Sequence, residues 1–234
     1  SRFVLSETKA VTAGQSGLGV VLSPAYRVGS LMLWLGYFMG LVIFSALINW
    51  MPIVFKDAGF APKHATLISA LFPLGGVGAI FFGWLMDRFN GNRIIAVGYA
   101  LTALSIAAIG QVAGNVGLLV LVVFVAGTIM NTAQSSMPAL AAGFYPTQGR
   151  ATGVSWMLGI GRFGGIAGSF LVAELARQQL SLPVIFAIVA VPGLIAMAAL
   201  IAGLNGLNVE IVCGARIIGI EKENNSIKKI VLDN

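Results

Sequence analysis

An arginine inside a long apolar stretch is the residue of this sequence best suited to do chemistry. Arg162 lies ~11 residues into a run predicted to be a membrane helix over about 151–174, hence ~16 Å deep and near the bilayer centre. A charge at that depth costs about 2.5–3.5 kcal/mol on insertion scales, so residues of this kind usually have a function. The planar guanidinium can bind a carboxylate through two parallel hydrogen bonds. Arg162 is therefore either an anion-binding residue or a structural arginine held by carbonyl groups.

A polar stripe lies in another apolar stretch. Asn131, Gln134, Ser135 and Pro138 follow the spacing i, i+3, i+4, i+7, which places them on one face of a helix. Lipid cannot form hydrogen bonds, so this face must meet protein or a cavity. The stripe predicts either a helix–helix contact or the lining of a substrate cavity, and Pro138 is expected to disturb the helix locally.

The first apolar stretch carries further candidates. Ser45 and Asn49 form a weaker polar pair at helical spacing. Tyr37 and Phe38 of this stretch, and Trp156 of another, could stack against an aromatic ring, although single aromatic residues more often serve packing. We therefore treat Asn49 and Tyr37 as candidate substrate-binding residues.

A short charged loop, GWLMDRFNGNR, separates two apolar runs. Gly83 would let another helix approach closely, and Asp87 could accept hydrogen bonds at the N-terminus of a neighbouring helix. Arg88 and Arg93 need water or lipid headgroups. The loop is interpreted either as an ordinary polar turn or as a motif that holds one conformation.

The elements that must position these residues are membrane helices. The chain is 58% hydrophobic and only 9% charged, whereas soluble domains are about a quarter charged. Because a membrane-spanning helix needs ~20 apolar residues, we predict an all-α polytopic membrane protein. Six transmembrane helices are expected at about 29–54, 65–86, 93–113, 116–142, 151–174 and 182–204.

The flanking segments differ from this membrane domain of residues 29–204. Residues 1–28 are predicted to be a polar cytoplasmic linker, and residues 205–234 a discordant soluble tail with a short β-hairpin-like pattern. An even number of spans places both termini on one side. Basic residues favour the cytoplasm for that side: Arg27, Arg88, Arg93 and Arg150 there, against Lys56, Lys63 and Arg177 opposite.

Composition also limits the classes of partner and chemistry. The net charge of +6 is expected to meet an anionic lipid surface, so no nucleic acid partner is predicted. The single Cys213 excludes a cysteine cluster, and His64, the only histidine, lies in a loop. The predicted spans hold no acid away from their ends, so no enzyme, metal site or cofactor is predicted.

Several motifs of the sequence resemble those of a known protein family. They are Gly83-x-Leu85-x-Asp87-Arg88, YPTQGRATGVSW at 145–156, GIGRFGG at 159–165, Asn49–Pro52 and Gln134-Ser135. Together they resemble helices 7–12 of the major facilitator superfamily, and within it the aromatic acid:proton symporter family. The loop motif departs at Asn90, where that family usually has glycine. The resemblance covers roughly residues 25–204.

The resemblance implies a function and a partner. It implies an inner (plasma) membrane transporter that imports a small organic anion, an aromatic carboxylate, with protons by alternating access. A missing N-terminal six-helix half would complete the twelve-helix bundle. Arg162 would then bind the carboxylate, and Arg150 would act in gating. The alternatives are a truncated or non-transporting fragment, or a major facilitator transporter of another organic solute.

Overall fold

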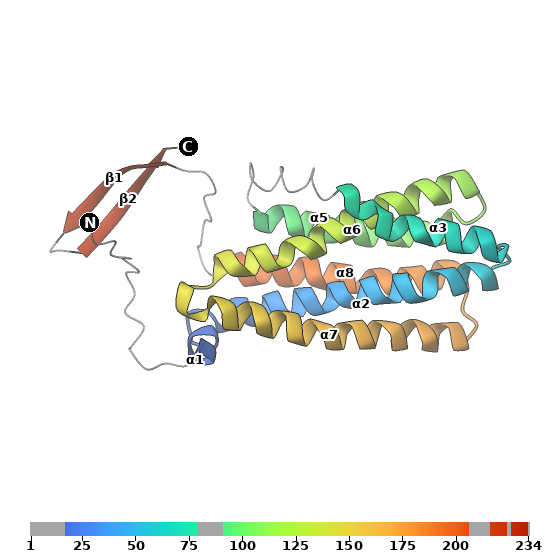
Figure 1. Ribbon diagram of the computed structural model, residues 1–234, viewed down its shortest axis with the longest axis horizontal. Coiled ribbons are helices and arrows are strands. Elements are labelled where there is room, and N and C mark those ends of the chain that lie inside the picture. The colour runs from blue at the N-terminus through green and yellow to red at the C-terminus, as the bar shows by residue number, and fades with distance from the viewer. Residues whose placement is uncertain (1–16, 79–90, 206–215, 224–225, 234) are drawn as a thin grey trace.

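The protein is a bundle of long helices in the computed structural model (Figure 1). The structure describes residues 17–78, 91–205, 216–223 and 226–233. The elements are α1 (Gly17–Val21), α2 (Arg27–Asp57), α3 (Pro62–Leu74), the 3₁₀ helix η1 (Gly75–Gly78), α5 (Gly91–Gln111), α6 (Val116–Phe144), α7 (Thr147–Arg177), α8 (Leu182–Asn205), β1 (Arg216–Glu223) and β2 (Ser226–Asp233).

Five helices of the described residues are long and apolar enough to cross a membrane, which makes the chain a multi-pass membrane protein. They are Arg27–Asp57, Arg93–Gln111, Val116–Phe144, Thr147–Arg177 and Leu182–Gly203. Each matches one of the spans predicted from hydropathy. The remaining predicted span, 65–86, is described only as far as α3 and η1, so the sixth crossing stays a prediction.

Local sequence explains where two of these helices begin and end. At the end of α2, Gly59 takes a φ of 94°, which glycine adopts without strain. The Phe60 amide then donates to the Phe55 carbonyl at 3.1 Å, and the two rings lie 5.6 Å apart. This is the Schellman arrangement, with its usual apolar contact across the end. Asn115 caps the start of α6 by accepting from the Leu118 amide at 3.1 Å.

The helices alternate in direction, so the basic residues at their termini form two groups at opposite ends of the bundle. Figure 1 shows the α2–α3 and α7–α8 connections at one end, and α1 with the α6–α7 connection at the other. The described basic residues form the two groups predicted from the sequence. One end of the bundle holds Arg27, Arg93 and Arg150, and the opposite end holds Lys56, Lys63 and Arg177. Which end faces the cytoplasm stays a prediction.

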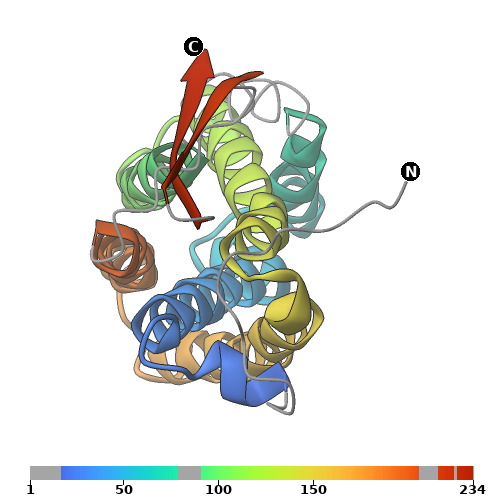
Figure 2. The same cartoon turned by 90° about the vertical axis from the view of Figure 1, so that its left-hand side faces the viewer.

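Each of the long helices packs against at least two others. α2 packs on α7 and α8, α5 packs on α6 and α8, and α3 packs on α2 and α6 (Figure 2). α1, within the segment predicted to be a linker, packs on α7 and buries Val20 and Val21. β1 and β2 pair antiparallel, with Arg216 opposite Asp233 and Glu223 opposite Ser226.

Glycines on α7 bring this helix close to α2. A Cβ added at Gly164 or Gly168 would collide with the backbone carbonyls of Phe38 and Val42 respectively, and one at Gly161 with a side chain of α2. Small residues at a spacing of three or four positions allow this close approach of two helices. The same contact fixes the rotation of α7 and hence the direction of its other faces.

Candidate functional site

Arg162 is the central residue of α7, about 22 Å from either end at 1.5 Å per residue. The helix is longer than the span predicted over 151–174, because it begins at Thr147, directly after Pro146. Since the hydrocarbon core is only about 30 Å thick, the centre of the helix corresponds to the predicted depth near the middle of the membrane. The Arg162 side chain is exposed and makes no hydrogen bond or ion pair with any described residue. Its surroundings include the exposed apolar side chains Phe163 and Ile166.

Tyr37 reaches the same region from α2. Its ring packs against the backbone of α7 at Gly161, where any side chain would collide with it. The Tyr37 hydroxyl also interacts electrostatically with the Arg162 guanidinium. The structure therefore brings together two residues that the sequence indicated separately, on helices that are far apart in the chain.

Gln134 joins this pair from α6. Its Oε1 accepts a 2.6 Å hydrogen bond from the Tyr99 hydroxyl, and its Nε2 donates to the Tyr37 carbonyl oxygen at 3.4 Å. The Gln134 side chain also interacts with the Tyr37 hydroxyl. Only 8% of Gln134 is exposed, so it is largely enclosed between helices. Arg162, Tyr37 and Gln134 form the candidate site.

Tyr99 is a member of this network that the sequence pattern did not indicate. It lies in the middle of α5 and is fully buried. A buried tyrosine hydroxyl usually finds a hydrogen-bond partner, which is the only signal that could have pointed to it. That signal does not say which helix supplies the partner.

Asn131, another residue of the predicted stripe, is engaged in a helix–helix contact. Its Nδ2 donates to the Phe72 carbonyl at 3.0 Å and to the Gly127 carbonyl at 2.7 Å. Both amide protons are thus used. The contact lies where α3 gives way to η1, and Gly75 and Gly127 let the two backbones touch there. Of the two interpretations of the stripe, this geometry favours the helix contact for Asn131.

The remaining predicted binding residues lie apart from Arg162. Ser135 is exposed and donates to the Thr132 carbonyl of its own helix at 3.1 Å. Asn49 donates to the Ser169 hydroxyl on α7 at 3.0 Å. It lies about 18 Å along α2 from Tyr37 at 1.5 Å per residue, so the structure does not bring it to the candidate site. Helix α6 continues through Pro138.

The predicted gating residues are only partly described. Arg93 lies in the first turn of α5 and Arg150 in the first turn of α7, both exposed at the same end of the bundle. Gly83, Asp87 and Arg88 lie outside the described residues. The interpretation of this loop as a conformational motif therefore stays a prediction.

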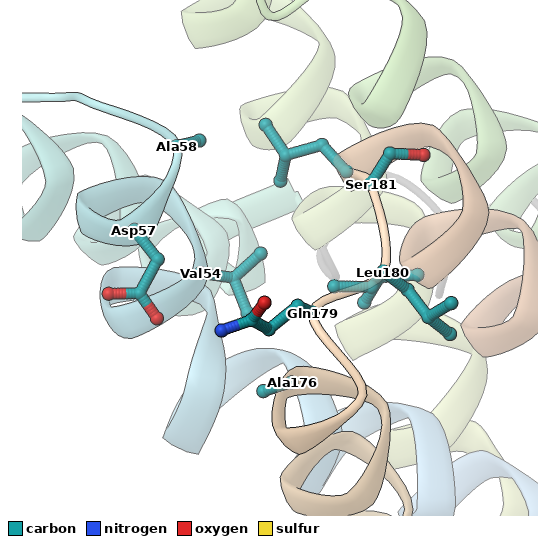
Figure 3. Close-up of a pocket in the computed structure, with 9 residues that line it drawn as sticks. Val54, Asp57, Ala58, Ala176, Gln179, Leu180 and Ser181 are labelled. Carbon is teal, nitrogen blue, oxygen red and sulfur yellow. The ribbon is translucent and has the colours of Figure 1, made fainter.

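A cavity of about 450 Å³ lies at the other end of the bundle. It is formed where α2 ends and α7 turns into α8 (Figure 3). Its lining includes Asp57, Gln179 and Ser181. Ala176 of this lining is about 21 Å along α7 from Arg162, so the cavity is distinct from the candidate site. Arg162 instead stands on an exposed face of α7.

Comparison with known proteins gives a family model and relatives. The Major Facilitator Superfamily model matches residues 33–207. The chain is 50% identical over 174 residues to a 4-hydroxybenzoate transporter of Pseudomonas putida, covering 74% of this chain and 39% of that protein. It is 44% identical over 203 residues to a gallate transporter of Pseudomonas putida, covering 86% and 45%. A 3-(3-hydroxy-phenyl)propionate transporter of Escherichia coli is 34% identical over 159 residues, covering 68% and 39%. The chain thus spans less than half the length of these relatives.

Proposed function

Because the chain belongs to the Major Facilitator Superfamily, we propose that it forms the second six-helix half of a transporter that imports an aromatic carboxylate with protons. Transport would proceed by alternating access around a site near the middle of the membrane. The names of the relatives support this substrate class, since they include transporters of 4-hydroxybenzoate, gallate and 3-(3-hydroxy-phenyl)propionate. A carrier of this class is not an enzyme.

The observation that carries the proposal is Arg162. A guanidinium at the centre of α7, without an ion pair among the described residues, leaves its charge available to a substrate anion. An intramembrane charge is costly, so its retention favours a role in binding or coupling. Two parallel hydrogen bonds to a carboxylate would offset that cost when the substrate is bound.

Tyr37 and Gln134 would complete the anion site. The Tyr37 hydroxyl beside Arg162 can donate a further hydrogen bond to the carboxylate, and Gln134 holds the α2 side of the site. Trp156 lies on the exposed side of α7 and stacks on Trp34 at 6.0 Å, which offers an aromatic surface for the substrate ring. Ser135, Asn49 and Asn131 are hydrogen-bonded elsewhere and are not assigned to this site.

The exposed apolar face of α7 suggests the partner of this half. Phe163 is 66% exposed and Phe170 is 71% exposed, on the same helix as the charged Arg162. A face that combines large apolar residues with a central charge suits another protein surface better than lipid. We assign it to the N-terminal six-helix half, with both termini of this chain in the cytoplasm at the inner membrane. The loop with Gly83, Asp87 and Arg88 would gate this contact together with Arg93 and Arg150.

The test uses a chimera in which this chain replaces the matching segment of the Pseudomonas putida 4-hydroxybenzoate transporter. Uptake of 4-hydroxybenzoate is measured in reconstituted vesicles with and without a proton gradient. Arg162→Ala should reduce affinity about ten- to hundredfold, the effect of losing a charged hydrogen bond worth about 1.5–3 kcal/mol. Arg162→Lys should retain part of the affinity, because lysine keeps the charge but not the planar geometry.

Arg177→Ala provides the matched control on the same helix. Arg177 pairs with Glu174 at 2.8 Å in an exposed position, and such surface pairs contribute only about 0–1 kcal/mol. Its removal should leave uptake unchanged. If folded Arg162→Ala binds 4-hydroxybenzoate as well as the unsubstituted chimera, the anion site lies elsewhere.

A further inference from the structure

One polar chain links four helices of the bundle. The Tyr99 hydroxyl of α5 donates to Gln134 of α6, and Gln134 donates to the backbone of Tyr37 on α2. The Tyr37 ring in turn packs against α7 at Gly161, the residue next to Arg162, and its hydroxyl interacts electrostatically with the guanidinium. Tyr99, which is fully buried, is thus connected to the region of Arg162 through the Gln134 side chain and through Tyr37.

The orientation of the Gln134 amide follows from its two partners. A backbone carbonyl can only accept, so the Tyr37 carbonyl must face the Nε2 group of Gln134. The Oε1 atom then faces Tyr99, whose hydroxyl must be the donor, and the 2.6 Å separation is short for such a bond. The Tyr37 carbonyl therefore fixes the orientation of the amide, and the Tyr99 hydroxyl supplies the donor that the Oε1 atom needs in this orientation.

The surrounding backbone leaves the amide little room to turn. Gly40 on α2 lies beside it, and a Cβ added there would collide with the Gln134 Oε1 and lie 2.6 Å from the Tyr99 hydroxyl oxygen. Glycine at this position lets the hydrogen-bonded pair approach α2. Both Tyr99 and Gln134 are buried, so water cannot replace the hydrogen bond that either partner loses.

We propose that Tyr99 is a positioning residue for substrate recognition, which acts by orienting Gln134 so that Tyr37 is held beside Arg162. This inference rests on the proposed function, in which Arg162 binds the carboxylate. Without the Tyr99 hydroxyl, the Oε1 atom of Gln134 stays buried without this donor, which destabilises the orientation that the Tyr37 carbonyl requires. Tyr37 then no longer holds one position beside the guanidinium, and the bound carboxylate loses part of its hydrogen bonding.

Tyr99→Phe tests the proposal because it removes one oxygen atom and keeps the ring. In the chimera described above, its KM for 4-hydroxybenzoate should rise about three- to tenfold, the range of one lost neutral hydrogen bond. Its maximal rate should change much less, because the contact acts on binding of the anion. Gly40→Ala should also raise KM, because the added methyl group displaces the hydrogen-bonded pair while Tyr99 is intact. This variant replaces Tyr99→Phe as the test if Tyr99→Phe yields little folded protein.

Tyr145→Phe is the matched control. Tyr145 is a buried tyrosine at the end of the bundle, and its hydroxyl interacts with Ser30 and Trp34 but has hydrogen-bond geometry to no described residue. Removal of this hydroxyl should leave KM unchanged. A double variant tests the route of action: Tyr99→Phe combined with Gln134→Leu should have the KM of Gln134→Leu alone, since the hydroxyl acts through the amide.

Three results would overturn the proposal. The first is a Tyr99→Phe chimera that melts at a lower temperature but keeps its KM, which would make the hydroxyl purely structural. The second is a double variant whose effects on KM multiply, which would show that Tyr99 does not act through Gln134. The third is a folded, unsubstituted chimera that neither binds nor takes up 4-hydroxybenzoate. Only this third result refutes the proposed function as well.

Discussion

The close approach of α2 and α7 allows a sharp prediction at Gly168. A Cβ built at this position would lie 2.8 Å from the carbonyl carbon and 2.9 Å from the Cα of Val42, and closer still to the carbonyl oxygen. Carbon atoms in contact are normally about 3.5–4.0 Å apart. Gly168→Ala therefore requires the two helices to separate by roughly 1 Å, because backbone atoms cannot move aside as a flexible side chain can.

The expected cost is that of overpacking, about 1–3 kcal/mol. Helix association in membranes depends on packing between small residues, so a separation along this interface also weakens neighbouring contacts. The Asn49–Ser169 hydrogen bond, 3.0 Å long and adjacent to Gly168, should lengthen or break. The change is measured as the melting temperature of the purified chain in detergent.

Gly159→Ala is the matched control because Gly159 lies on the same helix with no atom within 4 Å of an added Cβ. Alanine there should stabilise the helix by about 0.5–1 kcal/mol through the smaller entropy of the unfolded chain. The two substitutions add the same methyl group and should shift the melting temperature in opposite directions. If Gly168→Ala is as stable as Gly159→Ala, α7 does not pack on α2 through this face.

Two further predictions follow from the remaining contacts and from the topology. Asn131→Leu should destabilise the chain by about 1–2 kcal/mol, because the Phe72 carbonyl loses its donor, and thermal unfolding in detergent checks this. Cysteines at Phe60 and Gln178 should react with an impermeant thiol reagent added outside intact cells, whereas a cysteine at Gln148 should not; the reverse labelling pattern would place the termini outside.

Hydropathy alone predicted much of the fold. A membrane helix needs about 20 apolar residues, so the positions of the five described spans could be located without any knowledge of contacts. The predicted span over about 151–174 lies within α7, and the helix also includes the polar residues from Thr147 to Arg150 because it begins directly after Pro146. The family was likewise predicted from short motifs, and the comparison over residues 33–207 confirms it.

The sequence by itself determined that an arginine stands deep in an apolar helix and that small residues recur along the same helix. Both facts depend only on residue type and on the 3.6-residue helical repeat. It could not determine which residues surround the arginine. Tyr99, Gln134 and Tyr37 come from three helices and Arg162 from a fourth, and only the packing of these helices brings the first three into hydrogen-bond distance and sets Tyr37 against α7 beside Arg162. Tertiary structure decided the site because the spacing within one helix says nothing about which face of another helix it meets.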